Sequence, residues 1–341
     1  MGKPTRSAAE LNARLTSYAE NYLSHALANQ SFTVHPLTDH LMANSYDYDG
    51  GNEVVVPILD GYTATGGWHS RGGAINLQFV DHATQARYTP KFLYESIVLD
   101  WTDEQITKGE GAALRFVEDA INAAIMRIWE ALSLSICDSA TSTNVTAATT
   151  GTPVTAIRDI IDATGAIGGV NPATAGQTWW AAYEKNSAGS FTSNGASQMR
   201  TAWTTITKYK NLGAPTKIFM SKTAYTAYLA SGLSMSNIFR QPGGNMAVDI
   251  GTGTPTYNMV PVEYEPHLDT YIDTSTNTGI ILFVNNNGVR LMVDPSSKMT
   301  ISPFVNLLPG SRLGRAAVIT LTTEAICQSR ACLGVMTDIS A

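Results

Sequence analysis

The feature that most constrains this chain is a single long amphipathic helix that directly follows an arm with strand periodicity. Apolar residues recur at three- and four-residue spacing across about residues 111–137, which predicts one helix. The members of this stripe are Leu114, Val117, Ile121, Ala124, Ile125, Ile128, Leu132 and Ile136. At 1.5 Å per residue the helix is about 40 Å long, roughly twice the usual length. Such a helix indicates a structural strut.

The arm before the helix covers residues 54–100. Residues 54–59, 75–80 and 92–99 predict three strands, of which residues 75–80 alternate with a period of two. Pro57 favours a sheet edge for the first strand. Two glycine pairs lie between these strands, at Gly66-Gly67 and Gly72-Gly73. A ribbon of this kind is marginal alone and needs a partner surface. The order of arm and strut therefore indicates assembly with other chains.

The remaining segments predict an α+β protein. The first 28 residues contain a helical pattern, and residues 29–53 are expected to be extended and rich in turns. Further helices are expected at 154–164, 198–212 and 221–230, and strands at 217–220, 256–264, 279–284, 289–293, 299–303 and 316–327. Residues 139–155 and 232–255 are expected to be loops.

Composition narrows the function class. Charged residues make up 15% of the 341 residues, against a typical value of about 25%. A charge-poor surface suits contact with other chains, although secreted β-proteins share it. The net charge of −6 argues against tight sequence-specific nucleic-acid binding, which needs clustered Lys and Arg. The N-terminus lacks the apolar core of a signal peptide, and we expect no membrane-spanning segment.

The motifs of common active sites are absent from the sequence. It contains no phosphate-binding loop of the Walker type, no nucleophile elbow, no His-Glu-x-x-His and no Cys-x-x-Cys. We therefore expect no catalytic, cofactor-binding or metal-binding residues. Cys137, Cys327 and Cys332 are expected to be buried free thiols, which fits synthesis in a reducing cytoplasm.

His35, Asp39 and His40 come nearest to a metal-binding cluster in the sequence. On extended chain the two imidazoles would point to opposite faces, so we expect solvated or packing histidines. The adjacent Trp179 and Trp180 could stack on a ligand, but one ring in the core and one at an interface is the commoner use of such a pair.

Three stretches in the right order resemble the major capsid proteins of tailed bacteriophages, which share the HK97 fold. The first is the arm and long helix, residues 57–137. The second is Ile167-Gly168-Gly169-Val170-Asn171 followed by Trp179-Trp180. The third comprises the closing segments, including Phe283-Val284-Asn285, Leu291-Met292-Val293, Pro303-Phe304 and the run from Ile326 to Thr337.

The resemblance covers about residue 54 to the C-terminus and implies a domain order. Residues 1–53 would form an N-terminal arm and residues 54–100 the hairpin that this family calls the E-loop. Residues 101–215 would form a P-domain with its spine helix at 111–137, residues 216–295 an A-domain, and residues 296–341 strands returning to the sheets of both domains.

The resemblance also implies a function. We expect pentamers and hexamers that build an icosahedral virion shell around double-stranded DNA, made in the host cytoplasm and touching the DNA weakly and without specificity. A portal and a possible decoration protein would be further partners. The contacts with a neighbouring subunit are expected at Trp68 and Arg71 on the arm, and at Phe79, Asp81 and Arg87 near its tip.

Two departures from the family pattern refine this expectation. Some relatives link neighbouring subunits through an E-loop lysine, but residues 61–90 contain no lysine and Lys91 lies at the base of the arm. We therefore expect a shell without covalent cross-links. Some relatives carry a scaffolding segment before the arm, whereas here only about fifty residues precede it. A separate scaffolding protein is expected.

Three other interpretations remain open at the level of sequence. An encapsulin-like nanocompartment would share the fold but hold different contents. A soluble enzyme with a cleft between two lobes is a second alternative. A secreted surface-layer or adhesion protein is a third, against which the absence of a signal peptide counts.

Overall fold

The computed structural model describes most of the chain and divides it into two compact units. The described residues are 34–59, 68–73, 83–106, 110–138, 151–174, 176–186, 188–208, 212–236, 255–269, 279–307 and 314–340. Unit 1 comprises residues 1–33, 92–131 and 294–322, and unit 2 comprises residues 34–91, 132–293 and 323–341. The helix expected within the first 28 residues and the strand expected at 75–80 lie outside the described residues.

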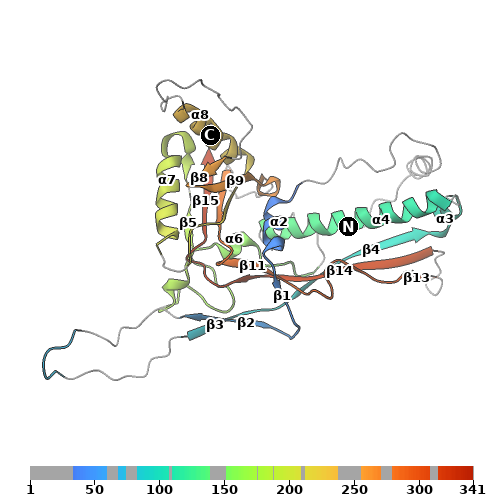
Figure 1. Cartoon of the computed structure of the whole chain (residues 1–341), viewed down its shortest axis with the longest axis horizontal. Coiled ribbons are helices and arrows are strands. Elements are labelled where there is room, and N and C mark those ends of the chain that lie inside the picture. The colour runs from blue at the N-terminus through green and yellow to red at the C-terminus, as the bar shows by residue number, and fades with distance from the viewer. Residues whose placement is uncertain are drawn as a thin grey trace. The chain divides into compact units, whose positions relative to one another are not determined.

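Unit 1 is built on β14 (Gly314–Cys327), whose first nine residues belong to it. β14 pairs with β4 (Lys91–Asp100), β12 (Thr300–Ile301) and β13 (Val305–Asn306). The last two pairings are antiparallel, with Ile301 opposite Ile319 and Val305 opposite Ala316. The long helix α4 (Glu110–Cys137) runs alongside β4 and β14 (Figure 1). It matches the helix expected over 111–137, and its stripe residues Ala124, Ile128, Leu132 and Ile136 are buried.

The short helix α3 (Trp101–Ile106) begins directly after β4. Asp100 caps this helix, because its carboxylate accepts the backbone N–H of Thr102 over 2.8 Å and also contacts the Thr102 hydroxyl. A side-chain oxygen that accepts a first-turn N–H stabilises a helix start.

The segment Val117–Cys137 of α4 is long and apolar enough, by length and composition, to cross a bilayer. Length and composition alone do not contradict the expectation that no segment spans a membrane. A long core helix has the same composition, and part of this one is buried within the chain. One such helix is weak evidence for a membrane protein.

Unit 2 contains a seven-stranded sheet with the order β5 (Tyr183–Lys185), β15 (Gly334–Ser340), β10 (Gly279–Val284), β7 (Lys217–Met220), β9 (Val260–Tyr264) and β8 (Thr256–Tyr257); β6 (Gly189–Ser190) also pairs with β15. All six residues of β10 are buried, as its unbroken apolar run predicts for a central strand. The helices α7 (Phe191–Ile206) and α8 (Lys222–Ser236) pack against this sheet.

Two smaller strand groups complete unit 2. β1 (Tyr46–Asp47) runs parallel to β11 (Val289–Val293), and β11 pairs antiparallel with the end of β14, from Val289 opposite Cys327 to Val293 opposite Thr323. β2 (Val54–Leu59) and β3 (Ala83–Tyr88) pair antiparallel along all six residues (Figure 1). We call β2, β3 and the chain between them the hairpin arm.

The segment around residues 35–44 differs from the expected extended chain, because it contains the helix α2 (Pro36–Ala43). Pro36 occupies the first turn, where its missing N–H costs no hydrogen bond. Leu37, Leu41 and Met42 form a buried face at helical spacing. The burial of these three apolar residues stabilises the helix. The turn-forming residues around it had led to the expectation of extended chain.

The helix expected over 154–164 shrinks to the single turn α6 (Ile157–Ile160), since tertiary contacts hold its flanks in other conformations. Ahead of it, the Thr155 N–H bonds to the Glu324 carboxylate over 2.9 Å, and Ala156 is extended. At its last residue, the buried Arg330 side chain binds the carbonyl of Ile160 over 2.7 Å. The helix expected over 198–212 also moves, to 191–206 in α7.

Candidate assembly surfaces

The hairpin arm has one face packed on its own unit and one face open. The alternation along β2 and β3 buries Val56, Ile58, Ala86 and Tyr88. The opposite face carries Val55 and Leu59, and Leu59 is 80% exposed. Each strand of this two-stranded ribbon pairs only with the other among the described residues. A ribbon with an exposed apolar row is suited to contact with a further chain.

The base of the arm is anchored by the glycine turn that the sequence analysis singled out. The backbone N–H of Arg87 donates to the carbonyl oxygen of Gly168 over 3.0 Å. Gly168 has a φ of +62°, and a methyl group in place of its hydrogen would lie 2.6 Å from the Cβ of Ala86. Only glycine fits this approach without displacement. The turn itself is closed by two hydrogen bonds of 3.1 Å between Ile167 and Val170.

Arg330, whose side chain is fully buried, fixes the segment that leads into the glycine turn. Its Nε donates to the Ile160 carbonyl and one Nη to the Gly165 carbonyl, each over 2.7 Å, and the other Nη reaches the Asp162 carbonyl. Burial lowers the pKa of the guanidinium. The Tyr88 hydroxyl adds a bond to the Cys327 carbonyl over 3.0 Å. Hydrogen bonds from several segments of unit 2 therefore hold the base of the arm.

The structure describes three of the five residues that were predicted to contact a neighbouring subunit. Trp68 is fully exposed and Arg71 is exposed, as an intersubunit role requires. Phe79 and Asp81 lie outside the described residues. Arg87 is exposed at the base of the arm, where it pairs with Glu53 over 3.6 Å. Among the described side chains no ion pair joins Arg71 to another residue, and none of these contacts with a neighbour is tested by a single chain.

A second exposed apolar surface, on unit 1, was missed by the sequence analysis. Arg127 of α4 bonds to Glu95 of β4 over 2.9 Å, so the odd-numbered side chains of β4 face α4. Because side chains alternate along a strand, Phe92, Tyr94 and Val98 point away from α4. They are 77%, 62% and 57% exposed.

Val305 extends this surface on the other side of β14. It lies opposite Ala316, an even-numbered residue of β14, whereas the odd-numbered Ala317, Ile319 and Leu321 are buried. Val305 is 65% exposed. We call Phe92, Tyr94, Val98 and Val305 the outer sheet face. Apolar residues at both parities of 92–99 were the available signal, since they predict a strand that is covered on both faces.

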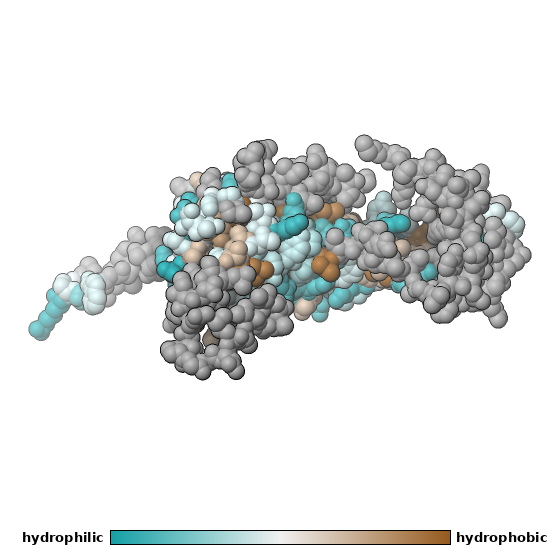
Figure 2. All heavy atoms as spheres, turned by 90° about the horizontal axis from the view of Figure 1, so that it is seen from above, coloured by the Kyte–Doolittle hydropathy of each residue, from teal (hydrophilic) through white to brown (hydrophobic). Residues whose placement is uncertain are grey.

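The face seen in Figure 2 differs from the outer sheet face in composition. There the described apolar side chains form small separate groups among polar ones. Scattered exposed apolar residues are normal on a protein surface, whereas a row of large ones on one face of a sheet indicates an interaction site.

Comparison with solved structures identifies the fold. The capsid protein in the cyanophage A-1(L) capsid asymmetric unit matches with a TM-score of 0.62 and 13% identity, over 97% of this chain and 99% of that one. The chain has the HK97-like capsid fold. The fold class expected from the sequence, α+β with an HK97-like arrangement, is thereby confirmed.

Two further structures with the HK97-like fold show similar agreement. The SrpI encapsulin complex from Synechococcus elongatus matches with a TM-score of 0.57 and 10% identity, over 99% of this chain and 97% of that one. The capsid structure of cyanophage P-SCSP1u matches with a TM-score of 0.54 and 10% identity, over 94% and 93%. No protein-family model and no curated protein matches the sequence.

Proposed function

We propose that this chain is a shell protein, the major capsid protein of a phage head that encloses double-stranded DNA. The observation that carries the proposal is the agreement in fold, over nearly the whole chain, with proteins solved as capsids and as an encapsulin complex. In this proposal the domain boundaries at residues 53, 100, 215 and 295 remain predictions, as do pentamers, hexamers, portal and scaffolding protein.

The exposed apolar surfaces support assembly. In the proposed shell the hairpin arm of one subunit lies over an adjacent subunit, and the outer sheet face is covered by a neighbour. Burying apolar area at roughly 25 cal/mol per Å² would favour such contacts. The low charge content lessens the cost of desolvating the surfaces.

The proposed shell is held together without covalent links and holds its DNA loosely. Residues 61–90 contain no lysine that could form an isopeptide bond. The net charge of −6 suits a wall that contains DNA without binding it tightly. The assignment as a structural, non-enzymatic protein belongs to the same proposal.

An encapsulin-like compartment is the second candidate, and the similarity to SrpI favours it specifically. Electron microscopy of purified particles separates the two. A DNA-filled shell with a portal and tail supports a phage head, and a closed shell loaded with protein supports a compartment. A chain that remains monomeric in light scattering across a wide concentration range would contradict both and favour a soluble enzyme.

The role of the two apolar surfaces has its own test. We expect Trp68→Ala, or Phe92→Ser combined with Tyr94→Ser, to leave the monomer folded but to reduce shell formation, measured as the assembled fraction in size-exclusion chromatography. Met126→Gln is a matched control, because Met126 is an exposed apolar residue on α4 rather than on the outer sheet face. Normal shells from both test variants would disprove the role of these surfaces while leaving the shell function intact.

A further inference from the structure

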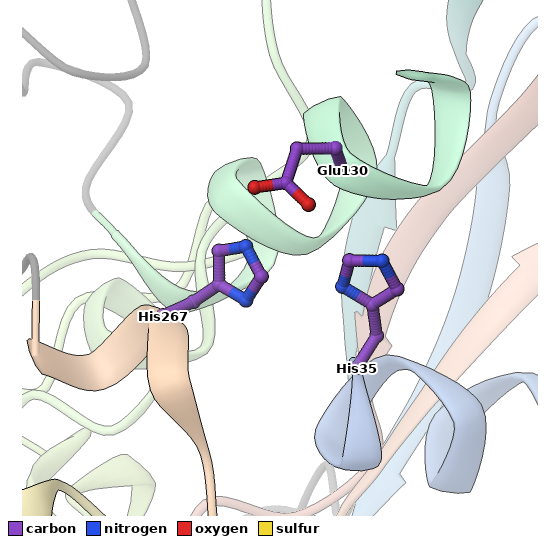
Figure 3. Close-up of side chains that lie close together, drawn as sticks. All are labelled: His35, Glu130 and His267. Carbon is purple, nitrogen blue, oxygen red and sulfur yellow. The ribbon is translucent and has the colours of Figure 1, made fainter. Parts of the chain in front are cut away.

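Two histidines that are far apart in the sequence lie together in unit 2. His35 precedes the first turn of α2, and His267 lies in the short helix η2 (Pro266–Asp269). Their rings stack with centroids 5.2 Å apart and an interplanar angle of 29° (Figure 3). A ring nitrogen of each lies within 4.8 Å of one of the other. With Zn–N bonds of about 2.0–2.1 Å, two nitrogens that share one zinc ion lie within about 4 Å of each other.

A carboxylate fixes one of these rings in the orientation that metal-binding histidines use. Nδ1 of His267 lies 3.1 Å from an oxygen of Glu265 and 3.2 Å from the Ser133 hydroxyl. Glu265 is fully buried. A carboxylate that accepts the Nδ1 proton holds the other nitrogen, Nε2, unprotonated and able to bind a metal.

The same carboxylate positions the second ring. The other oxygen of Glu265 accepts the backbone N–H of Leu37 over 2.8 Å, which fixes the start of α2 and therefore His35. The Nδ1 of His35 is buried. One buried carboxylate thus contacts the His267 ring and fixes the backbone of the first turn of α2, next to His35. Carboxylates of this kind commonly support the histidine ligands of a metal ion.

Imidazole is a ligand that zinc binds well, with Zn–N bonds of about 2.0–2.1 Å. Two neighbouring rings of unit 2 can therefore supply two of its ligands.

We propose that His35 and His267 bind one divalent transition-metal ion of the zinc class, with Glu265 orienting His267. The ion would join the start of α2 to η2, two segments of unit 2 that Glu265 already bridges. The site is independent of the shell function and would exist in a single chain. The sequence-based expectation for His35 was a solvated or packing histidine, and in the structure this residue stacks on His267.

The test measures zinc retained by the full-length chain after treatment with a chelator, reconstitution and dialysis. We expect about one zinc ion per chain, because a formed site retains metal that unfolded chain does not. Elemental analysis gives the stoichiometry, and the visible absorption of bound Co²⁺ reports its ligands. Affinity should fall as pH drops below about 6.5, since the imidazoles must be neutral to bind.

Variants locate the metal. His35→Gln and His267→Gln should each lower zinc affinity at least tenfold, whereas His69→Gln, which alters an exposed histidine, should match the wild type. Glu265→Gln keeps an acceptor for Leu37 and should cost about 10–100-fold in affinity.

Two results would overturn the proposal. One is a folded wild-type chain that retains no zinc or Co²⁺ at neutral pH, which would make the pair a packing stack. The other is a stoichiometry that is equal in the wild type and in a folded His35→Gln, His267→Gln double variant. Circular dichroism of each variant shows whether it is folded.

Discussion

Arg87 donates its backbone N–H to the carbonyl oxygen of Gly168, over 3.0 Å, at the base of the hairpin arm. The bond joins a strand of the arm to a turn about eighty positions later in the sequence. Gly168 lies so close to Ala86 and Tyr88 that no side chain fits between them. The glycine pair in the middle of the chain therefore supports the arm, which explains why these two distant features occur together in one protein.

Replacing Gly168 with alanine should loosen this base. The added methyl would meet the Cβ of Ala86 at 2.6 Å, and the residue's φ is +62°, so we expect a loss of about 1–3 kcal/mol in stability. Gly169→Ala is the matched control, because Gly169 also has a positive φ but nothing lies within 4 Å of its added methyl. Urea unfolding of the unassembled chain measures both. Equal losses would mean that backbone conformation matters here and the contact does not.

Removing the Arg330 guanidinium should lower the free energy of unfolding by more than replacing Gly168 with alanine does. Arg330→Met keeps most of the volume but leaves the carbonyls of Ile160, Asp162 and Gly165 without this donor. At roughly 1–3 kcal/mol for each buried group left unsatisfied, we expect a loss on the order of 3 kcal/mol or more. Arg290→Met, which removes one bond to the Asn286 carbonyl, should cost less. Similar unfolding midpoints for the two variants would contradict this ranking.

The stability of the chain should depend on pH through Glu324. Burial raises the pKa of this carboxyl, although the N–H groups of Thr155 and Ala325 partly oppose the shift. The folded state then holds its proton to a higher pH than the unfolded state does. Stability is therefore expected to fall as pH rises from the usual glutamate pKa to the raised one, and to level off above it.

Glu324→Gln should remove this part of the pH dependence, because the amide oxygen can still accept both N–H groups and carries no charge. Thermal unfolding from pH 4 to pH 8 compares the two proteins. A variant whose midpoint has the same slope as the wild type would show that another group is responsible.

The three cysteines should be unreactive in the folded chain. Cys137, Cys327 and Cys332 are buried and free. Burial raises the pKa of the Cys332 thiol to about 11 and raises the pKa of the other two as well, so little thiolate is present at pH 8. A thiol reagent should label the chain slowly when folded and at all three positions in denaturant. Rapid labelling of one cysteine in the folded chain would disprove the packing at that position.

The elements that could be predicted from the sequence are those whose own residues decide them. The unbroken apolar run of β10 and the long stripe of α4 each specify one conformation and a buried face. The prediction failed at α2 and α6, where hydrogen bonds to residues from distant segments determine the conformation. Glu265 holds the first turn of α2, and Glu324 and Arg330 hold the flanks of α6.

Of the candidate surfaces, too, one part could be predicted from the local sequence and another part depended on contacts between distant segments. Aromatic and arginine residues on a glycine-rich arm made Trp68 and Arg71 natural candidates, and the structure exposes both. The outer sheet face required the pairing of β4 with β14 and the Arg127–Glu95 contact, which identify the side of the sheet that is open. The pairing of His35 with His267 could not be found from spacing, since it joins two segments through Glu265.

The sequence by itself determined the local elements and their order, from the strand-patterned arm to the long helix and the closing strands. Periodicity encodes which residues of a helix or strand are buried, because it reflects contacts within a few residues. Only the tertiary structure decided which distant segments meet. The anchoring of the arm by Gly168, the open face of the unit 1 sheet and the stacked histidines all arise from hydrogen bonds and packing between residues that no local pattern connects.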